Sequence, residues 1–205
     1  MRTLSVSNVA YAFGRYPLFK EVSFDVPQGE VLLVKGPNGS GKSTLLKIMA
    51  GLLWAPQGKV EYLTDATLLD ETHLRRQLGM CAVEQNLYDE LTALENLVFF
   101  GHLRTHTDVT DRAKPLLERA SLWDHRHKAV KALSSGMRQK LKLLAAVIHE
   151  PGFLLLDEPG SNLDQTGMDF LCELIAAQQA RGPAVLASND PREFGFATRT
   201  FTIVL

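Results

Sequence analysis

Short apolar runs separated by turn-forming residues recur along this chain. Residues 4–9 and 22–26 alternate apolar and polar side chains, which predicts two half-buried antiparallel strands near the N-terminus. Residues 153–156 are consecutively apolar, a pattern typical of a strand buried on both faces of a parallel sheet. Further strands are predicted at residues 30–35, 59–63, 78–83, 184–188 and 200–204.

The other long segments have the composition and spacing of helices. Residues 45–50 contain helix formers without a breaker, and a second helix is predicted near residues 167–179. The block of about 88–150 has no strand signal and includes a helix from about Arg138. We therefore expect an α/β fold, one domain over residues 1–205, with this block inserted as a helical subdomain. Its apolar faces are predicted to contain Leu94, Leu97 and Val98, and then Ala113, Leu116, Leu117 and Ala120.

A glycine-rich segment lies between the strand at 30–35 and the helix at 45–50. It matches G-x-x-x-x-G-K-[ST], a motif in which backbone N–H groups and a helix start bind phosphate oxygens. Lys42 is expected to reach the β- and γ-phosphates of a nucleotide, and the Ser43 hydroxyl to join a Mg²⁺ shell. The predicted phosphate-binding residues are Gly36, Pro37, Asn38, Gly39, Ser40, Gly41, Lys42, Ser43 and Thr44.

Polar side chains follow two of the predicted strands at the edge where a parallel sheet places its ligands. Asp157 and Glu158 come directly after residues 153–156, and Gln85 follows residues 78–83. We expect Asp157 to hold Mg²⁺ and Glu158 to polarise the water that attacks the γ-phosphorus. Gln85 is expected to reach both the metal and that water.

The segment 11–16 is rich in aromatic residues and is predicted to be a loop between the first two strands. A flat side chain there can stack on a purine ring, and Phe13 is the first choice, with Tyr11 and Tyr16 behind it. The alternative is that these aromatic side chains belong to the core.

Composition and charge narrow the functional classes. The chain has 205 residues, of which 45% are hydrophobic and 22% charged, and its net charge is −1, so nothing favours a nucleic-acid-binding surface. No secretion signal opens the chain, and no stretch approaches the roughly 20 apolar residues that cross a bilayer. We expect a cytoplasmic protein that reaches a membrane only through a partner. Cys81 and Cys172 are predicted to be two buried thiols, and residues 124–128 an exposed loop rather than a metal site.

Residues 133–140, Leu-Ser-Ser-Gly-Met-Arg-Gln-Lys, resemble the LSGGQ signature of ABC transporter ATPases, with Ser135 and Met137 as departures. The glycine-rich motif, Gln85, this signature, Asp157-Glu158-Pro159 and the D-loop-like residues 161–164 occur in that family's order. The resemblance implies the ABC ATPase fold: a P-loop NTPase core sheet with an antiparallel β subdomain and an inserted α-helical subdomain.

The resemblance also implies the cofactors and partners. ATP and Mg²⁺ would be held in a head-to-tail homodimer, in which Ser134, Ser135 and Gly136 of one subunit cover the γ-phosphate bound by the other. Ser134 can cap the helix that begins near Arg138, which gives this surface a physical basis. Integral membrane permease subunits would dock near the helical subdomain, where Leu87, Tyr88 and Leu91 are available, although the same side chains can pack within the subdomain.

One departure concerns hydrolysis. The family usually has a histidine where this chain has Asn189, which donates a hydrogen bond but carries no charge. We expect a slow but active ATPase with Asn189 near the γ-phosphate. The short chain, the signature and Asn189-Asp190-Pro191 resemble the ATPase subunits of cytochrome c maturation haem exporters. Other exporters, a soluble ABC-type ATPase and a non-hydrolysing ATP-binding regulator remain alternatives.

Overall fold

A five-stranded parallel sheet forms the centre of the computed structural model, which describes residues 1–84 and 86–203. All neighbouring strands run in the same direction, so their carboxyl ends meet at one edge of the sheet. The predicted last strand is shorter than expected, and Val204 lies outside the described residues. The strand order is β6 (Leu78–Cys81), β7 (Phe153–Asp157), β8 (Ala184–Ala187), β3 (Val31–Lys35) and β9 (Arg199–Thr202).

A second, antiparallel sheet contains four strands in the order β2, β1, β4, β5. The predicted alternating strands are confirmed but longer, because β1 (Arg2–Phe13) and β2 (Tyr16–Pro27) form one hairpin. The prediction of a loop over residues 11–16 is therefore wrong; only Gly14 and Arg15 form the turn. Tyr and Phe favour strands, and this preference extends the pairing. The sheet is completed by β4 (Gln57–Thr64) and β5 (Thr67–Leu68).

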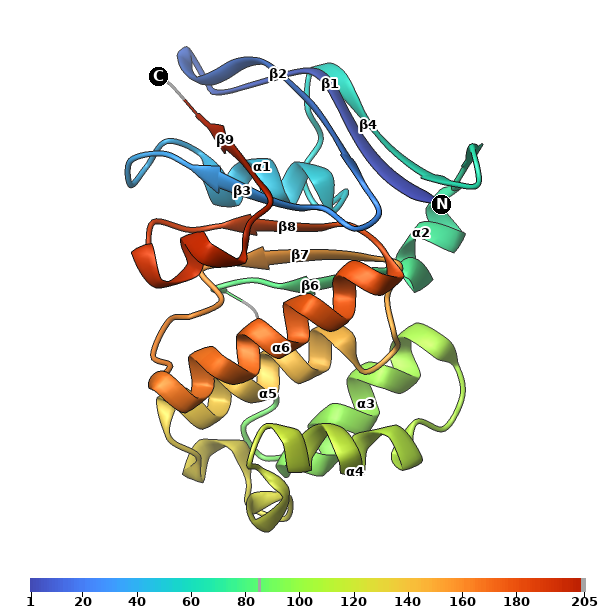
Figure 1. Cartoon of the computed structure of the whole chain (residues 1–205), viewed down its shortest axis with the longest axis vertical. Helices are drawn as coiled ribbons and strands as arrows, with labels where there is room; N and C mark the ends of the chain where they lie inside the picture. The colour runs from blue at the N-terminus through green and yellow to red at the C-terminus, as the bar shows by residue number, and fades with distance from the viewer. Residues whose placement is uncertain (85, 204–205) are drawn as a thin grey trace.

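Helices cover both faces of the parallel sheet (Figure 1). α1 and the antiparallel sheet lie on one side, α5 and α6 lie on the other, and α3 and α4 lie beyond them. None of the helices in the described ranges has both the length and the apolar character needed to cross a bilayer. The helices are α1 (Lys42–Met49), α2 (Glu71–Gln77), α3 (Ala93–Thr105), α4 (Thr110–Arg119), α5 (Ser135–Val147) and α6 (Gln165–Arg181), with 3₁₀ turns η1 (Trp123–His125), η2 (Val130–Ala132) and η3 (Pro191–Phe196).

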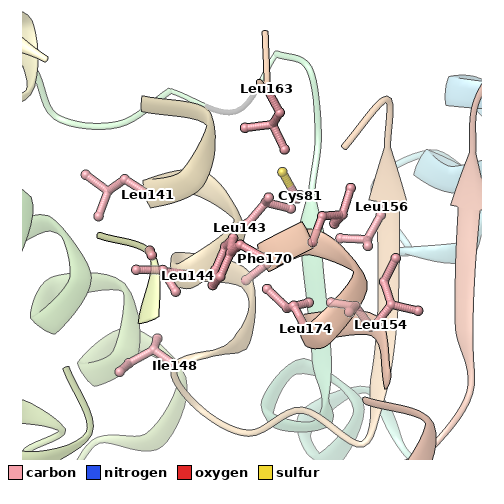
Figure 2. Packing of buried hydrophobic residues seen from close by; sticks show 14 of the residues in the cluster. Cys81, Leu141, Leu143, Leu144, Ile148, Leu154, Leu156, Leu163, Phe170 and Leu174 are labelled. Atoms are coloured by element: carbon pink, nitrogen blue, oxygen red, sulfur yellow. The ribbon is translucent and has the colours of Figure 1, made fainter. Parts of the chain in front are cut away.

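Alternating side chains of β7 divide the interior into two cores. Leu154 and Leu156 pack against α5 and α6, whereas Phe153 and Leu155 face α1 and the antiparallel sheet. Figure 2 shows the first core, where side chains of β7 meet those of α5 and α6. β7 is thus buried on both faces, as its sequence predicts.

Several boundaries differ from the prediction. α5 begins at Ser135 rather than near Arg138, because Ser134 caps it by accepting the Met137 N–H at 3.2 Å. α2 was not predicted, since it buries none of its residues and therefore has no apolar face.

The two cysteines differ in exposure. Cys81 is buried, which raises the pKa of its thiol to about 12, but Cys172 is exposed. The prediction of two buried thiols is therefore correct for Cys81 and wrong for Cys172.

Candidate functional site

The glycine-rich segment joins β3 to α1 at the carboxyl edge of the parallel sheet. Gly41 precedes the first residue of α1 with φ 97°, and no side chain caps this helix start. A Cβ on Gly41 would lie 2.6 Å from the Leu18 side chain, so the position has both a conformational and a steric need for glycine. The uncapped N–H groups of the first turn remain available to an anion.

Lys42 lies across the same loop. Its side chain is largely buried, and Nζ donates to the carbonyl oxygens of Gly36 at 2.9 Å and Pro37 at 3.4 Å. These contacts hold the ammonium group against the glycine-rich segment rather than in solvent. A positive charge and a helix start therefore face the same space, which is the arrangement that phosphate groups require.

Asp157, the last residue of β7, provides a buried carboxylate beside this loop. Only 4% of the residue is exposed, and Oδ1 has no hydrogen-bond partner among the described residues. Burial raises the pKa of Asp157, while the hydroxyl of Ser43 and the charge of Lys42 partly offset that rise. A free carboxylate oxygen next to a hydroxyl fits a hard cation such as Mg²⁺, which keeps several water ligands and needs few protein groups.

The Mg²⁺ ligand set is therefore small. No group of three His, Cys, Asp or Glu side chains comes together in the part of the chain that the structure describes. Gln85, the other predicted ligand, lies outside the described residues. Glu84, its neighbour, forms an ion pair with Lys47 at 2.7 Å. Asp157 and Ser43 remain as the pair that can hold the metal, together with the phosphates of a nucleotide.

Glu158 lies one residue beyond Asp157 in a left-handed conformation, with φ 47°. Its backbone N–H donates to the carbonyl of Ala187 at 2.9 Å, which fixes the turn at the end of β7. Burial raises the pKa of the Glu158 carboxyl, and the charge of Lys42 partly lowers it. A non-glycine residue in this region of φ is strained, and such strain is common where a side chain must be aimed at a site.

One pocket of about 410 Å³ is lined by eight of the predicted site residues. Phe13 is 57% exposed at the end of β1 and meets Tyr11 edge to face, whereas Tyr16 does not line the pocket. Leu18 was missed by the sequence analysis, because only the hairpin register brings it beneath the glycine-rich loop. The lining is Phe13, Leu18, Asn38, Gly39, Gly41, Lys42, Ser43, Thr44 and Glu158.

Asn189 follows β8 and reaches the same loop. Its Nδ2 donates to Oδ1 of Asn38 at 3.0 Å, so the end of β8 is tied to the glycine-rich segment. An amide at this position can turn a donor toward a phosphate oxygen without changing the local charge.

The signature residues lie elsewhere. Ser134 and Ser135 are exposed at the start of α5, and neither they nor Gly136 line the pocket around Lys42. A Cβ on Gly136 would come within 2.9 Å of the carbonyl oxygen of Asn162, so the signature packs closely on the segment after β7. The chain thus presents two separate helix starts to solvent.

Comparison with known proteins identifies this combination. The sequence profile described as "ABC transporter" matches residues 19–161. The chain belongs to the ABC transporter family. The order of motifs therefore led to the correct family, and the predicted ABC ATPase fold is confirmed by solved structures. One, an "ATP binding subunit of ABC transporter", has a TM-score of 0.87 and 26% identity, over 98% of this chain and 85% of that one.

A second similar solved structure is a dimer with bound nucleotide. It is a "dimeric structure of a post-hydrolysis state of the ATP-binding cassette MJ0796 bound to ADP and Pi", with a TM-score of 0.82 and 27% identity, over 98% of this chain and 94% of that one.

Among curated relatives, NatA of Bacillus subtilis, an ABC transporter ATP-binding protein, is 33% identical over 85% of this chain and 72% of its own length. The lantibiotic transport ATP-binding protein SrtF of Streptococcus pyogenes is 30% identical over 91% and 79%. YdbJ of Bacillus subtilis is 35% identical over 89% of this chain, which spans 59% of that relative's length. These relatives are named as ATP-binding proteins of transporters, and this chain is similar to them over most of its own length.

Proposed function

We propose that this chain binds MgATP in the pocket around Lys42, hydrolyses it to ADP and phosphate, and so drives transport through separate membrane subunits. The observation that carries the proposal is the meeting of Lys42, Ser43 and Glu158 in one pocket, with the buried Asp157 beside it. Family membership supports ATP as the nucleotide. Phe13, exposed at the pocket's edge, is proposed to stack on the adenine.

The proposed chemistry follows from the positions of these groups. The N–H groups of the glycine-rich loop and Lys42 bind the β- and γ-phosphates and stabilise the charge that develops on them. Ser43 and Asp157, with Gln85 as a further proposed ligand, would hold Mg²⁺, which would supply positive charge to the phosphates when bound. Glu158 orients a water in line with the γ-phosphorus and accepts its proton, for which the raised pKa of the Glu158 carboxyl is suitable. Asn189 donates to a γ-phosphate oxygen in place of Asn38.

The active form is proposed to be a head-to-tail homodimer with ATP between the two chains. The signature residues Ser134, Ser135 and Gly136 do not line the pocket of their own chain, which is expected if they serve a second one. The solved structure of MJ0796, which is dimeric and bound to ADP and Pi, supports a dimer, and its head-to-tail arrangement is part of the proposal. Dimer closure and reopening would then transmit the energy of hydrolysis to the membrane subunits.

Permease subunits are proposed to dock beside the helical subdomain at the cytoplasmic face of the membrane. Tyr88 is 50% exposed and packs edge to face on Phe99 at 4.9 Å, which leaves aromatic surface available. Leu87 packs partly against the core, which supports the packing alternative for this side chain. The exposed surface of Tyr88 is the part that is proposed to receive a partner. SrtF is named for lantibiotic transport, and a Bradyrhizobium relative for Nod factor export. The haem-exporter subtype rests on the sequence resemblance alone.

Two other functions remain as competitors. A regulator that binds ATP without turnover is favoured by Asn189, which replaces the family's usual histidine. A soluble ABC-type ATPase without a transporter would use the same pocket. Co-purification of a multi-span membrane protein with the tagged chain separates the transporter from the soluble ATPase.

Glu158→Gln tests hydrolysis directly. Gln keeps the shape but cannot accept a proton, so turnover is expected to fall by about a hundredfold or more, while MgATP affinity changes by less than about threefold and an ATP-bound dimer accumulates. Glu118→Gln, an exposed change on α4, is the matched control. Equal turnover in Glu158→Gln and the parent would contradict the assignment, and a parent without turnover would favour the regulator.

A further inference from the structure

A carboxyl group outside the pocket is buried between two of the loops that flank it. Glu193, in η3, is 0% exposed, and its Oε1 accepts a hydrogen bond of 2.8 Å from the N–H of Gly160. Its Oε2 is also buried and has no hydrogen-bond partner among the described residues. Burying a carboxyl group costs free energy, so the hydrogen bond that it accepts must offset that cost, and an apolar side chain could not accept this bond.

The partner of Glu193 is the turn that carries Glu158. Gly160 lies two residues after Glu158, and the N–H of Ser161 donates to the Glu158 carbonyl at 3.1 Å. A Cβ on Gly160 would lie 2.4 Å from Oε1 of Glu193, so the carboxyl fits against bare backbone. The Glu193 side chain therefore contacts the turn directly behind the proposed catalytic residue.

Arg192 makes a second connection between the same two segments. Its Nη1 donates to the carbonyl of Leu163 at 3.1 Å, and its Nε is held by Asp190 at 2.9 Å. Asp190 directly follows Asn189, which reaches the glycine-rich loop through Asn38. Residues 189–193 thus connect the phosphate side of the pocket to residues 160–163.

The opposite side of residues 159–163 contacts the signature helix. Gln139 of α5 is buried, and its Nε2 donates to the carbonyl of Pro159 at 2.9 Å. Gly136 approaches the carbonyl of Asn162 so closely that a methyl group would collide with it. Residues 159–163 are therefore held between η3 on one side and α5 on the other.

We propose that Glu193 is a positioning residue for ATP hydrolysis, which fixes residues 160–163 to the loop of Asn189 so that Glu158 and the signature surface are aligned together. The inference rests on the proposed function. Among the described residues, Glu193 is not part of the lining of the nucleotide pocket, so it acts through Gly160 and the backbone beyond it.

The charge state of Glu193 modulates this contact. Burial raises the pKa of the carboxyl to about 7, the Gly160 N–H and the Ser188 hydroxyl lower it in part, and the charges of Glu158 and Asp190 raise it further. Arg192 lies on the same turn, and Lys35 of β3 sits 3.3 Å from the centre of the Phe194 ring. An ionised carboxylate accepts the Gly160 N–H more strongly than a neutral one, so the contact strengthens as the pH rises through neutrality.

Glu193→Gln separates charge from shape. The amide oxygen can still accept from Gly160, so the protein should fold, but kcat is expected to fall about fivefold near pH 8 with KM for ATP within about twofold. The ratio of parent kcat to variant kcat should rise between about pH 6 and pH 8. Glu193→Ala and Gly160→Ala should each lower kcat by about tenfold or more. Glu118→Gln is again the control.

Each other result counts against the inference. A Glu193→Gln protein that follows the parent at every pH, or a change confined to KM, would assign Glu193 a purely structural role. If Glu193→Ala does not fold, Glu193→Gln and Gly160→Ala decide. A parent that binds ATP without turnover contradicts the proposed function instead. In that case, hydrogen–deuterium exchange over residues 158–164 tests the role of Glu193. If the inference is right, Glu193→Gln loses the protection that ATP gives these residues. If the protection is kept, the inference is wrong.

Discussion

Two of the helix starts in this chain, those of α1 and α5, differ in whether a side chain caps them. α1 begins after Gly41 in a left-handed conformation with no side-chain cap, whereas α5 is capped by Ser134. α1 begins with Lys42, and the buried Asp157 and Glu158, both from the end of β7, lie beside this helix start. At the start of α5, the carbonyl of Asn162 lies close to Gly136, and Ser135, Arg138 and Lys142 line a pocket that also includes Asn162.

This difference explains why the proposed site at α1 can be described from a single chain, whereas the proposed site at α5 cannot. A helix start supplies N–H groups and a partial positive charge, but tight phosphate binding also needs a full charge and a closed pocket. At α1 the fold supplies the charge of Lys42 and brings Glu158 into the same pocket, because β3, β7 and β8 end at the same edge of the sheet. We propose that at α5 a second molecule supplies the rest of the site, which is the physical basis for the proposed dimer.

Lys42→Ala should break the first site most severely. Removing the ammonium leaves the glycine-rich loop without its full positive charge, and turnover is expected to fall by about a thousandfold. MgATP affinity, measured with a fluorescent analogue, should weaken by at least about tenfold. Lys128→Ala, an exposed change, should leave both values unaltered. Normal MgATP binding by Lys42→Ala would mean that the two helix starts do not differ in the way described.

Glu193 links the two sites, and its burial has a cost that depends on pH. Its pKa is about 7 in the folded chain, against an ordinary value of 4.5 for a glutamate, so the folded chain binds more protons between these limits and loses stability as the pH rises through them. Relative to Glu193→Gln, the parent should lose up to about 3 kcal/mol of unfolding free energy across this range and nothing further above it. Urea unfolding at several pH values measures the difference. A constant difference would show that Glu193 does not titrate there.

The residues proposed for the first site could be placed in the fold from the sequence because they are close in the chain or follow recognisable strands. Asp157 and Glu158 could be placed because residues 153–156 are continuously apolar, which indicates a central strand. Leu18 and Glu193 could not, since their positions depend on the hairpin register and on how η3 packs. Phe13 was chosen for its chemistry, although the segment containing it is a hairpin end rather than a loop.

Gly136→Ala should affect the second site while sparing the first. A methyl group would approach the Asn162 carbonyl oxygen to within 2.9 Å, so the start of α5 or the segment after β7 must shift. We expect turnover to fall about tenfold, with MgATP affinity of the monomer within about twofold of the parent. Gly195→Ala, where a Cβ meets nothing within 4 Å, is the matched control. Unchanged turnover in Gly136→Ala would remove the support for a site shared between two chains.

Substitutions of Asn189 are expected to have the smallest effect on turnover, and they test how much the end of β8 contributes to the pocket around Lys42. Its Nδ2 now donates to Asn38, a contact that a γ-phosphate oxygen would replace, so Asn189→Ala loses one neutral donor and turnover should fall about threefold to tenfold. Asn189→His restores a donor and adds a charge below about pH 6.5, so its turnover relative to the parent should increase as the pH falls toward 6. Steady-state kinetics from about pH 6 to pH 8 measure both variants. If Asn189→Ala equals the parent throughout, the end of β8 contributes nothing to hydrolysis, and Lys42 and Glu158 alone account for the chemistry of the pocket.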